Sequence, residues 1–319
     1  MMAINAQGVR KDFGGVAAIR GLDLAIEKGT VAGLIGPDGA GKSTLLRLLV
    51  GLLRPTAGRI EIAGFDVEKK PFEIKERVGY MPQHFSMYGD LTVAENMRFF
   101  ADMHRVKARR FVERKAELLK FSALAPFEDR LARNLSGGMQ KKLALACSLF
   151  HTPQILLLDE PTTGVDPLSR QELWHLLDEL HGRGVTILLT TPYMDEAARC
   201  RRVGFIDEGR MLAYDSPENL ILAMKDEIAE LIAPPPPSLR ALKDMSDLKG
   251  AHPFGDKVHI MLKAGGAGLE QIRRRLEDNG IAVESLRLIK PSFEDVFLAL
   301  APRRPEQSRA DDASGVSDG

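Results

Sequence analysis

The chain has 319 residues, which is enough for one full domain and a smaller second unit. Hydrophobic residues make up 44% and charged residues 28%, an ordinary balance for a globular protein. The 44 Lys and Arg residues match the 44 Asp and Glu residues, so the chain lacks the basic excess typical of nucleic-acid-binding proteins, and we expect no nucleic-acid partner.

Cysteine usage and hydropathy are typical of a protein of the cytosol. Cys147 and Cys200 lie far apart and match no metal-ligand spacing, which predicts two reduced thiols. Residues 1–11 lack the apolar core of a signal peptide. The most apolar stretch, 45–53, is interrupted by Arg47 and is shorter than the roughly 18 residues that cross a bilayer. We therefore expect any membrane role to require another polypeptide.

Short apolar runs alternate with helical segments along the first two thirds of the chain. This alternation predicts an α/β core with a mainly parallel, buried sheet. The predicted strands are 31–35, 155–158 and 185–189, and the predicted helices of this core are 43–53 and 168–181.

Composition also divides the chain into parts. We expect a core over 1–232 that contains a mostly helical insert at about 84–140. The proline run 234–237 predicts a stiff linker at 233–237. A small α/β appendage over 238–301 follows, with strands at 257–263 and 281–289 and helices at 269–279 and 292–300. The polar segment 302–319 lacks periodicity and predicts a disordered tail.

A glycine-rich loop follows the first predicted strand. The segment Gly36-Pro-Asp-Gly-Ala-Gly-Lys-Ser43 fits the phosphate-loop pattern G-x-x-x-x-G-K-[ST], and it lies between a strand and a helix as that pattern requires. Glycines let backbone N–H groups converge on phosphate oxygens, and the helix points its positive end at them. We expect Lys42 to bridge the β- and γ-phosphates of ATP and Ser43 to bind Mg²⁺.

Two acidic residues end the second predicted strand. Asp159 comes directly after four aliphatic residues and is placed to hold the metal ion, while Glu160 is a candidate general base for the attacking water. Strands that end in two acidic residues are common, so the pair alone is moderate evidence for these roles. Together with the phosphate loop it is strong evidence.

Further motifs follow in a fixed order. The segment Leu135-Ser-Gly-Gly-Met-Gln140 lies upstream of the strand that ends in Asp159, Gln83 follows Tyr-Met-Pro, and 163–166 reads Thr-Gly-Val-Asp. Over 13–196 this set resembles the ABC ATPases, whose signature motif, Q-loop and D-loop have this form. The resemblance implies a phosphate-loop NTPase fold with a helical subdomain.

The resemblance also implies roles for individual residues. It assigns catalysis to Glu160 and Gln83, and metal binding to Ser43, Gln83 and Asp159. Phe13 would stack on adenine; the alternative is that this aromatic residue is part of the core. The ATP-binding set is Phe13, Gly36, Pro37, Asp38, Gly39, Ala40, Gly41, Lys42, Ser43, Thr44, Ser136, Gly137 and Gly138.

In ABC proteins two nucleotide-binding domains close head to tail, so that Ser136-Gly137-Gly138 of one chain would contact the γ-phosphate held by the other. A dimer is therefore implied. One family feature is missing: the segment 190–197 has Pro192 where the family has a switch histidine, and proline offers no side-chain donor. Either a homodimer hydrolyses ATP slowly with Glu160 alone, or this chain pairs with a second ATPase that carries the histidine. We favour the heterodimer.

The last segment favours an exporter. Lys290-Pro-Ser-Phe-Glu-Asp-Val-Phe-Leu-Ala-Leu300 resembles the ending of ATPases from drug, antibiotic and polysaccharide exporters. The expected partner is a membrane permease, and the expected location is the inner face of the cell membrane. Two rivals stay open: a non-transport ABC ATPase, and a regulatory subunit that binds ATP without turnover.

Overall fold

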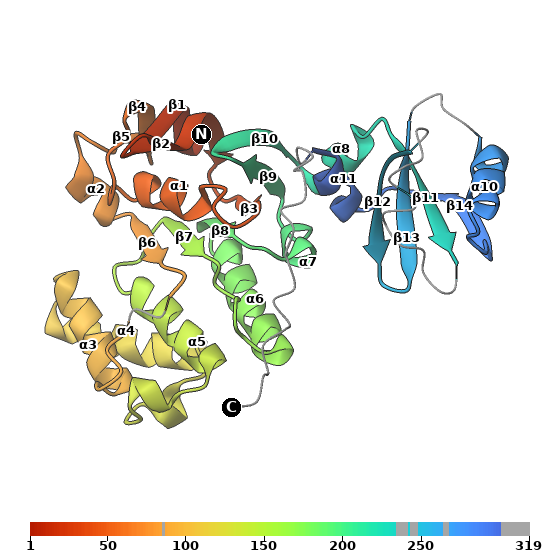
Figure 1. Ribbon diagram of the computed structural model, residues 1–319. Helices are drawn as coiled ribbons and strands as arrows, with labels where there is room; N and C mark the ends of the chain where they lie inside the picture. Colours follow the sequence, from red (N-terminus) through yellow and green to blue (C-terminus); the bar gives the residue numbers. More distant parts are fainter. Residues whose placement is uncertain (85–86, 234–241, 243–247, 264–267, 301–319) are drawn as a thin grey trace, which may run out of the picture.

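The computed structural model describes residues 1–84, 87–233, 242, 248–263 and 268–300. Three sheets organise the chain, two of them in the nucleotide-binding core and one in a C-terminal unit beside it (Figure 1). The predicted α/β class with a mainly parallel central sheet is confirmed.

The central sheet has six strands in the order β10-β9-β3-β8-β7-β6, and all are parallel except β10. Because β3, β8 and β7 are direct neighbours, their carboxyl ends meet at one edge. This edge is where ligands bind in open parallel sheets. The strands are β3 (Val31–Ile35), β6 (Val78–Met81), β7 (Ile155–Asp159), β8 (Thr186–Thr190), β9 (Arg202–Asp207) and β10 (Arg210–Asp215).

An antiparallel sheet in the order β2-β1-β4-β5 covers one side of the core. We did not predict it, because its apolar residues alternate with polar ones and give no continuous apolar run. Helix α1 (Lys42–Leu49) packs against both sheets, with its four leucines fully buried. The strands are β1 (Met2–Phe13), β2 (Val16–Glu27), β4 (Ala57–Ile62) and β5 (Phe65–Asp66), and α2 (Pro71–Lys75) follows them.

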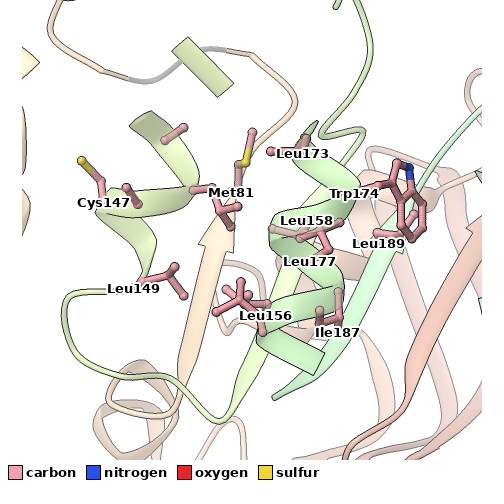
Figure 2. Close-up of a cluster of buried hydrophobic side chains, with 14 of the residues drawn as sticks. Met81, Cys147, Leu149, Leu156, Leu158, Leu173, Trp174, Leu177, Ile187 and Leu189 are labelled. Carbon is pink, nitrogen blue, oxygen red and sulfur yellow. The ribbon is translucent and has the colours of Figure 1, made fainter. Parts of the chain in front are cut away.

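The segment expected to form the helical insert, about 84–140, contains α3 (Val93–Met103), α4 (Ala108–Phe121) and the first turn of α5 (Gly137–Ser148). Thr92 and Glu95 form a reciprocal capping box that starts α3. Helices α5 and α6 (Pro167–Gly182) pack on the central sheet in one apolar cluster, which includes Leu177 of α6, Met81 of β6 and Leu158 of β7 (Figure 2). The insert is therefore packed onto the core and is not a separate domain.

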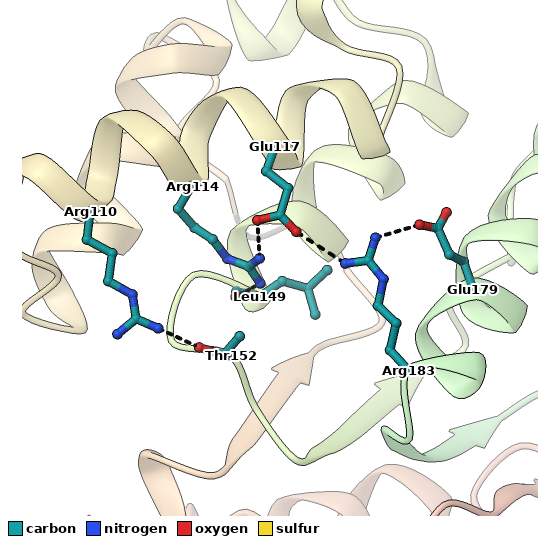
Figure 3. A network of polar contacts seen from close by, with 7 residues as sticks. All are labelled: Arg110, Arg114, Glu117, Leu149, Thr152, Glu179 and Arg183. Carbon is teal, nitrogen blue, oxygen red and sulfur yellow. Dashed lines mark hydrogen bonds and ion pairs between the residues drawn. The ribbon is translucent and has the colours of Figure 1, made fainter.

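A polar network also joins α4 of the insert to the end of α6 in the core (Figure 3). Glu117 lies at its centre: it accepts hydrogen bonds from Arg114 (2.6 Å) and Arg183 (3.2 Å). The hydrogen bond from Arg114, helped by the charge of Arg183, holds the pKa of Glu117 below its ordinary value. The network comprises Arg110, Arg114, Glu117, Leu149, Thr152, Glu179 and Arg183.

The C-terminal unit is an antiparallel sheet in the order β12-β13-β11-β14 with α10 (Leu269–Asp278). Its strands are β11 (Glu227–Ile232), β12 (Leu248–Phe254), β13 (Lys257–Leu262) and β14 (Ser285–Ile289). The prediction that the core extends to residue 232 is wrong for β11, which pairs with β13 and β14. Apart from Ala233, the predicted linker 233–237 lies outside the described residues, as does the predicted tail 302–319.

The last helix connects the C-terminal unit to the core. Helix α11 (Phe293–Leu300) packs against α8 (Pro217–Leu222), and its Phe293 ring centroid lies 5.1 Å from that of Phe205 in β9. The sequence pattern had placed this helix wholly in the appendage, because it comes last in the chain. Among the described residues, none of the helices combines the length and the apolar character needed to cross a lipid bilayer.

Candidate functional site

A cleft of about 340 Å³ lies at the carboxyl edge of β3 and β7. It collects residues from four distant parts of the chain, including the phosphate loop, Gln83 and Glu160. A larger cleft of about 430 Å³ is lined by residues that precede β7 and β8, so it lies at the opposite edge of the sheet and holds none of the phosphate-loop residues. The smaller cleft is lined by Ala18, Asp38, Gly39, Ala40, Gly41, Lys42, Ser43, Thr44, Gln83 and Glu160.

Close packing explains why two positions of the phosphate loop are occupied by glycine. A Cβ atom at Gly36 would lie 2.0 Å from the carbonyl oxygen of Ile206, and one at Gly41 would lie 2.6 Å from that of Ala18. Gly41 also has a φ of 103°, which disfavours any other residue. Helix α1 begins directly after it without a side-chain cap, so its first N–H groups point toward the loop and suit an anion.

Lys42 is buried in this loop. Its Nζ donates hydrogen bonds to the carbonyl oxygens of Gly36 (2.7 Å) and Pro37 (3.1 Å). The amine is therefore held over the cradle of backbone N–H groups, where it adds a positive charge for phosphate oxygens.

Asp159 and Ser43, both expected from the sequence to bind the metal ion, face one another. The Ser43 hydroxyl donates to Asp159 Oδ1 (3.0 Å), and the Thr190 hydroxyl donates to the same oxygen (2.8 Å). Asp159 is only 1% exposed, and its second oxygen, Oδ2, is buried without a hydrogen-bond partner. A buried carboxylate oxygen beside a hydroxyl fits a hard cation such as Mg²⁺.

Glu160 occupies a strained position. Its φ of 47° is left-handed, which a residue with a side chain adopts at a cost of about 1–3 kcal/mol when the surroundings require it. Three hydrogen bonds hold it there: its N–H donates to Thr190 (2.9 Å), and its Oε2 accepts from Gln83 Nε2 (2.8 Å) and Thr163 Oγ1 (3.1 Å). The carboxylate lines the cleft next to Gln83.

The sequence did not single out Lys141, which links the two sides of this site. Its side chain comes from α5, is 9% exposed, and donates to the backbone oxygens of Gln83 (2.8 Å) and Glu160 (3.4 Å). Burial lowers the pKa of Lys141, and the charges of Glu160 and Asp159 partly oppose this effect. A lysine among several basic residues next to a helix start gave no signal of this role. The role of Thr190 also gave no signal in the sequence, because this residue simply ends an apolar strand.

We expect Lys141→Met to lower the turnover number for ATP by roughly 10- to 100-fold, because Gln83 and Glu160 lose the amine that holds their backbone carbonyl oxygens in place. The Michaelis constant should change little, since the phosphate loop is untouched. Steady-state kinetics with ATP would check this. The matched control is Lys142→Met, whose amine pairs with Glu172 away from the cleft. Equal effects in the two variants would contradict the assignment.

Two predicted parts of the site are not in this cleft. Ser136 begins α5, where its hydroxyl accepts a hydrogen bond from the N–H of Met139 (3.3 Å), and neither it nor Gly137 or Gly138 lines the cleft. Phe13 also lies outside the lining, at the end of β1, with 45% of its surface exposed and Lys11 Nζ 5.0 Å from its ring centroid. One chain thus brings the phosphate loop together with Asp159, Glu160 and Gln83, but leaves the signature segment elsewhere.

The turn after β8 is held firmly although its Pro192 is exposed. Buried Glu196 accepts hydrogen bonds from the hydroxyls of Thr191 (2.6 Å) and Thr162 (2.9 Å). The guanidinium of Arg170 lies over the ring of Tyr193, 3.9 Å from its centroid. Pro192 is therefore presented at the carboxyl edge of the sheet, next to the strand that ends in Asp159, by a turn that does not depend on the proline itself.

The fold and the cleft define a phosphate-loop nucleotide-binding protein with a helical subdomain. Residues 19–163 match the model of the ABC transporter family. The chain is 38% identical over 318 residues to the daunorubicin resistance ATP-binding protein DrrA2 of Streptomyces coeruleorubidus, with 98% of this chain and 99% of that protein covered. The chain belongs to the ABC transporter ATP-binding proteins, a family of transport ATPases.

Other relatives agree with this assignment. The chain is 41% identical over 303 residues to the probable multidrug ABC transporter ATP-binding protein YbhF of Escherichia coli (strain K12); the match covers 93% of this chain but 52% of YbhF, so this chain spans about half of that protein. The dimeric ATP-binding cassette MJ0796 bound to ADP and Pi is similar in structure, with a TM-score of 0.61, 26% identity, and coverage of 67% of this chain and 98% of that one. The resemblance to exporter-type ABC ATPases is thereby confirmed.

Proposed function

We propose that this chain binds and hydrolyses MgATP to energise export through a separate membrane permease. The observation that carries the proposal is the pairing of a complete phosphate loop with Glu160, which Gln83 and Thr163 hold in the same cleft. Names of relatives that refer to daunorubicin resistance and to Nod factor export support the direction of transport. A chain with this role would lie at the cytoplasmic face of the membrane, against its permease.

Each residue of the cleft has a role in this proposal. The phosphate loop and Lys42 bind the β- and γ-phosphates, and Glu160 accepts a proton from the water that attacks the γ-phosphate. Ser43, Asp159 and Gln83 would hold Mg²⁺, which neutralises phosphate charge when bound. Phe13 is the proposed platform for the adenine ring. Gln83 has a second task, since its Nε2 orients the Glu160 carboxylate.

The active form in this proposal is a head-to-tail dimer. The signature segment lies outside the cleft of its own chain, and a dimeric cassette bound to ADP and Pi is among the similar structures. Ser136, Gly137, Gly138 and the positive end of α5 would then complete the site of the partner.

Complementation between two inactive variants tests this arrangement. Lys42→Ala removes the phosphate-loop charge. Gly137→Asp puts a carboxylate at the start of α5, and it fits because a Cβ there meets nothing closer than 3.4 Å, whereas Gly138 is blocked by Ser169 at 2.3 Å. We expect each variant alone to be inactive and an equal mixture to regain up to about a quarter of the wild-type phosphate release per chain, because a mixed dimer keeps one intact site.

The control for the mixture is Lys42→Ala mixed with Lys42→Ala/Gly137→Asp, in which no dimer has an intact site. No recovery in the test mixture, when each variant still dimerises, would contradict the shared site. Specific activity of the wild type should also rise with protein concentration.

Pro192 favours a second candidate function. A site without the switch donor would turn over slowly, and this chain could then serve mainly to complete the site of a second ATPase that carries a histidine there. In that heterodimer, the signature segment 136–138 of this chain would complete the ATP site of the second ATPase. A wild type that binds ATP but releases no phosphate at any concentration would favour this candidate.

A further inference from the structure

A buried group of two histidines and one aspartate lies far from the ATP cleft. His252 comes from β12, His259 from β13, and Asp295 from α11, so three elements of the C-terminal unit converge on one point. His259 is 3% and Asp295 0% exposed, and the His252 side chain is 13% exposed. Within the described part of the chain, this is the one group of His, Cys, Asp or Glu residues with ligand atoms close enough to share an ion.

One atom of this group is not satisfied by the protein. His259 Nδ1 makes a hydrogen bond of 2.9 Å to Asp295 Oδ1. His252 Nε2 lies 3.0 Å from the same oxygen, yet it is buried and makes no hydrogen bond. A buried ring nitrogen without a partner is costly, and it indicates an unaccounted ligand.

Hydrogen bonds hold the Asp295 carboxylate in a fixed orientation. Its other oxygen, Oδ2, accepts hydrogen bonds from the N–H and the hydroxyl of Ser292, both 2.6 Å long, where the two residues cap the start of α11. Burial raises the pKa of Asp295, but its contacts with His252, Ser292 and His259 outweigh this, and the pKa lies well below its ordinary value. Oδ1 is therefore held in place, 2.9 Å from His259 Nδ1 and 3.0 Å from His252 Nε2.

We propose that His252 Nε2, His259 Nδ1 and Asp295 Oδ1 form a site for a zinc-like divalent metal ion. The separations of 3.0 and 2.9 Å from the oxygen to the two nitrogens are close to the roughly 3.3 Å edge of a tetrahedron with zinc–ligand bonds of about 2.0–2.1 Å. Imidazole and carboxylate are ligands that Zn²⁺ accepts. Water would supply the fourth ligand.

Such an ion would fasten the C-terminal sheet to the core. Asp295 belongs to α11, whose Phe293 and Val296 are buried in the core cluster with Phe205. The two histidines belong to the C-terminal sheet. Metal binding would therefore stabilise the position of this sheet on α11 and raise the melting temperature of the folded chain.

The test uses the full chain, stripped of metal with a chelator and without nucleotide, so that the ATP site takes up no magnesium complex. Calorimetric titration with Zn²⁺ should give one ion per chain, and the melting temperature should rise with added Zn²⁺. His252→Gln should weaken Zn²⁺ binding by at least about 100-fold, because losing a ligand costs more than losing a supporting group. Co²⁺ in place of Zn²⁺ should give the visible absorption of a tetrahedral site in the wild type alone.

Two controls separate this site from other metal binding. His175→Gln removes an exposed histidine of α6, and Ser43→Ala removes a proposed Mg²⁺ ligand; both should bind Zn²⁺ like the wild type. Cys147 and Cys200 are buried, and burial raises the pKa of both thiols, so neither competes. A wild type that takes up no Zn²⁺, or a His252→Gln variant with wild-type affinity, would overturn the proposal.

Discussion

Replacing Glu160 with glutamine is expected to lower phosphate release from ATP by roughly 10²- to 10⁴-fold while ATP still binds. Glutamine has nearly the same shape, and its side-chain oxygen can still accept a hydrogen bond from Gln83 or Thr163. What is lost is the carboxylate that takes the proton from the attacking water. The phosphate loop, which supplies the binding contacts, is unchanged.

The measurement combines phosphate release with gel filtration in the presence of MgATP. If turnover is what opens the dimer, Glu160→Gln should accumulate as an ATP-bound dimer, whereas the wild type should exchange between monomer and dimer. Glu113→Gln on the exposed side of α4 is the matched control for an acid-to-amide change. Phosphate release that stays at the wild-type level in Glu160→Gln would remove Glu160 from the catalytic role.

Introducing a histidine at Pro192 is expected to raise phosphate release by about 10²- to 10³-fold if the missing donor limits the homodimer. One charge-stabilising donor at a developing oxyanion contributes about 2.7–4 kcal/mol. The turn should tolerate the change, because Thr191, Glu196 and Arg170 hold it through contacts that do not involve Pro192. The backbone position next to the strand that Glu160 follows is therefore retained.

Pro192→Ala separates the donor from the proline ring, since it removes the ring without adding a donor. The expected order of turnover is Pro192→His well above both Pro192→Ala and the wild type. Equal rates for histidine and alanine would mean that the donor is not what limits this chain. A second ATPase subunit would then be the better explanation for a slow homodimer, and adding a candidate subunit should restore turnover.

The phosphate loop and the residues at the end of β7 show which features of the site can be predicted from a short stretch of sequence. A glycine pattern between an apolar run and a helix was sufficient to predict the cradle, and four aliphatic residues before Asp159 were sufficient to predict a strand end. The reason is physical: these features depend on residues that are neighbours in the chain. The backbone requirement for glycine and the burial of a strand are both visible in a short window.

The partners of those residues came only from the fold. Lys141 and Thr190 reach the site from different elements, and no spacing in the chain shows that α5 directs one lysine at the backbone of Glu160. The assignment of β11 failed for a related reason. A strand of an antiparallel sheet carries no mark of which sheet it joins, and pairing with β13 and β14 is decided by contacts across the chain.

The sequence by itself determined the α/β class, the phosphate loop, the acids at the end of β7 and the helical insert, because each depends on local residue chemistry and periodicity. The tertiary structure alone decided that Glu160 is held at a left-handed φ by Thr190, Gln83 and Thr163. It also decided that α11 ties the C-terminal sheet to the core, and that His252, His259 and Asp295 meet. Contacts between residues far apart in the chain depend on how the elements pack, and packing is a property of the whole fold.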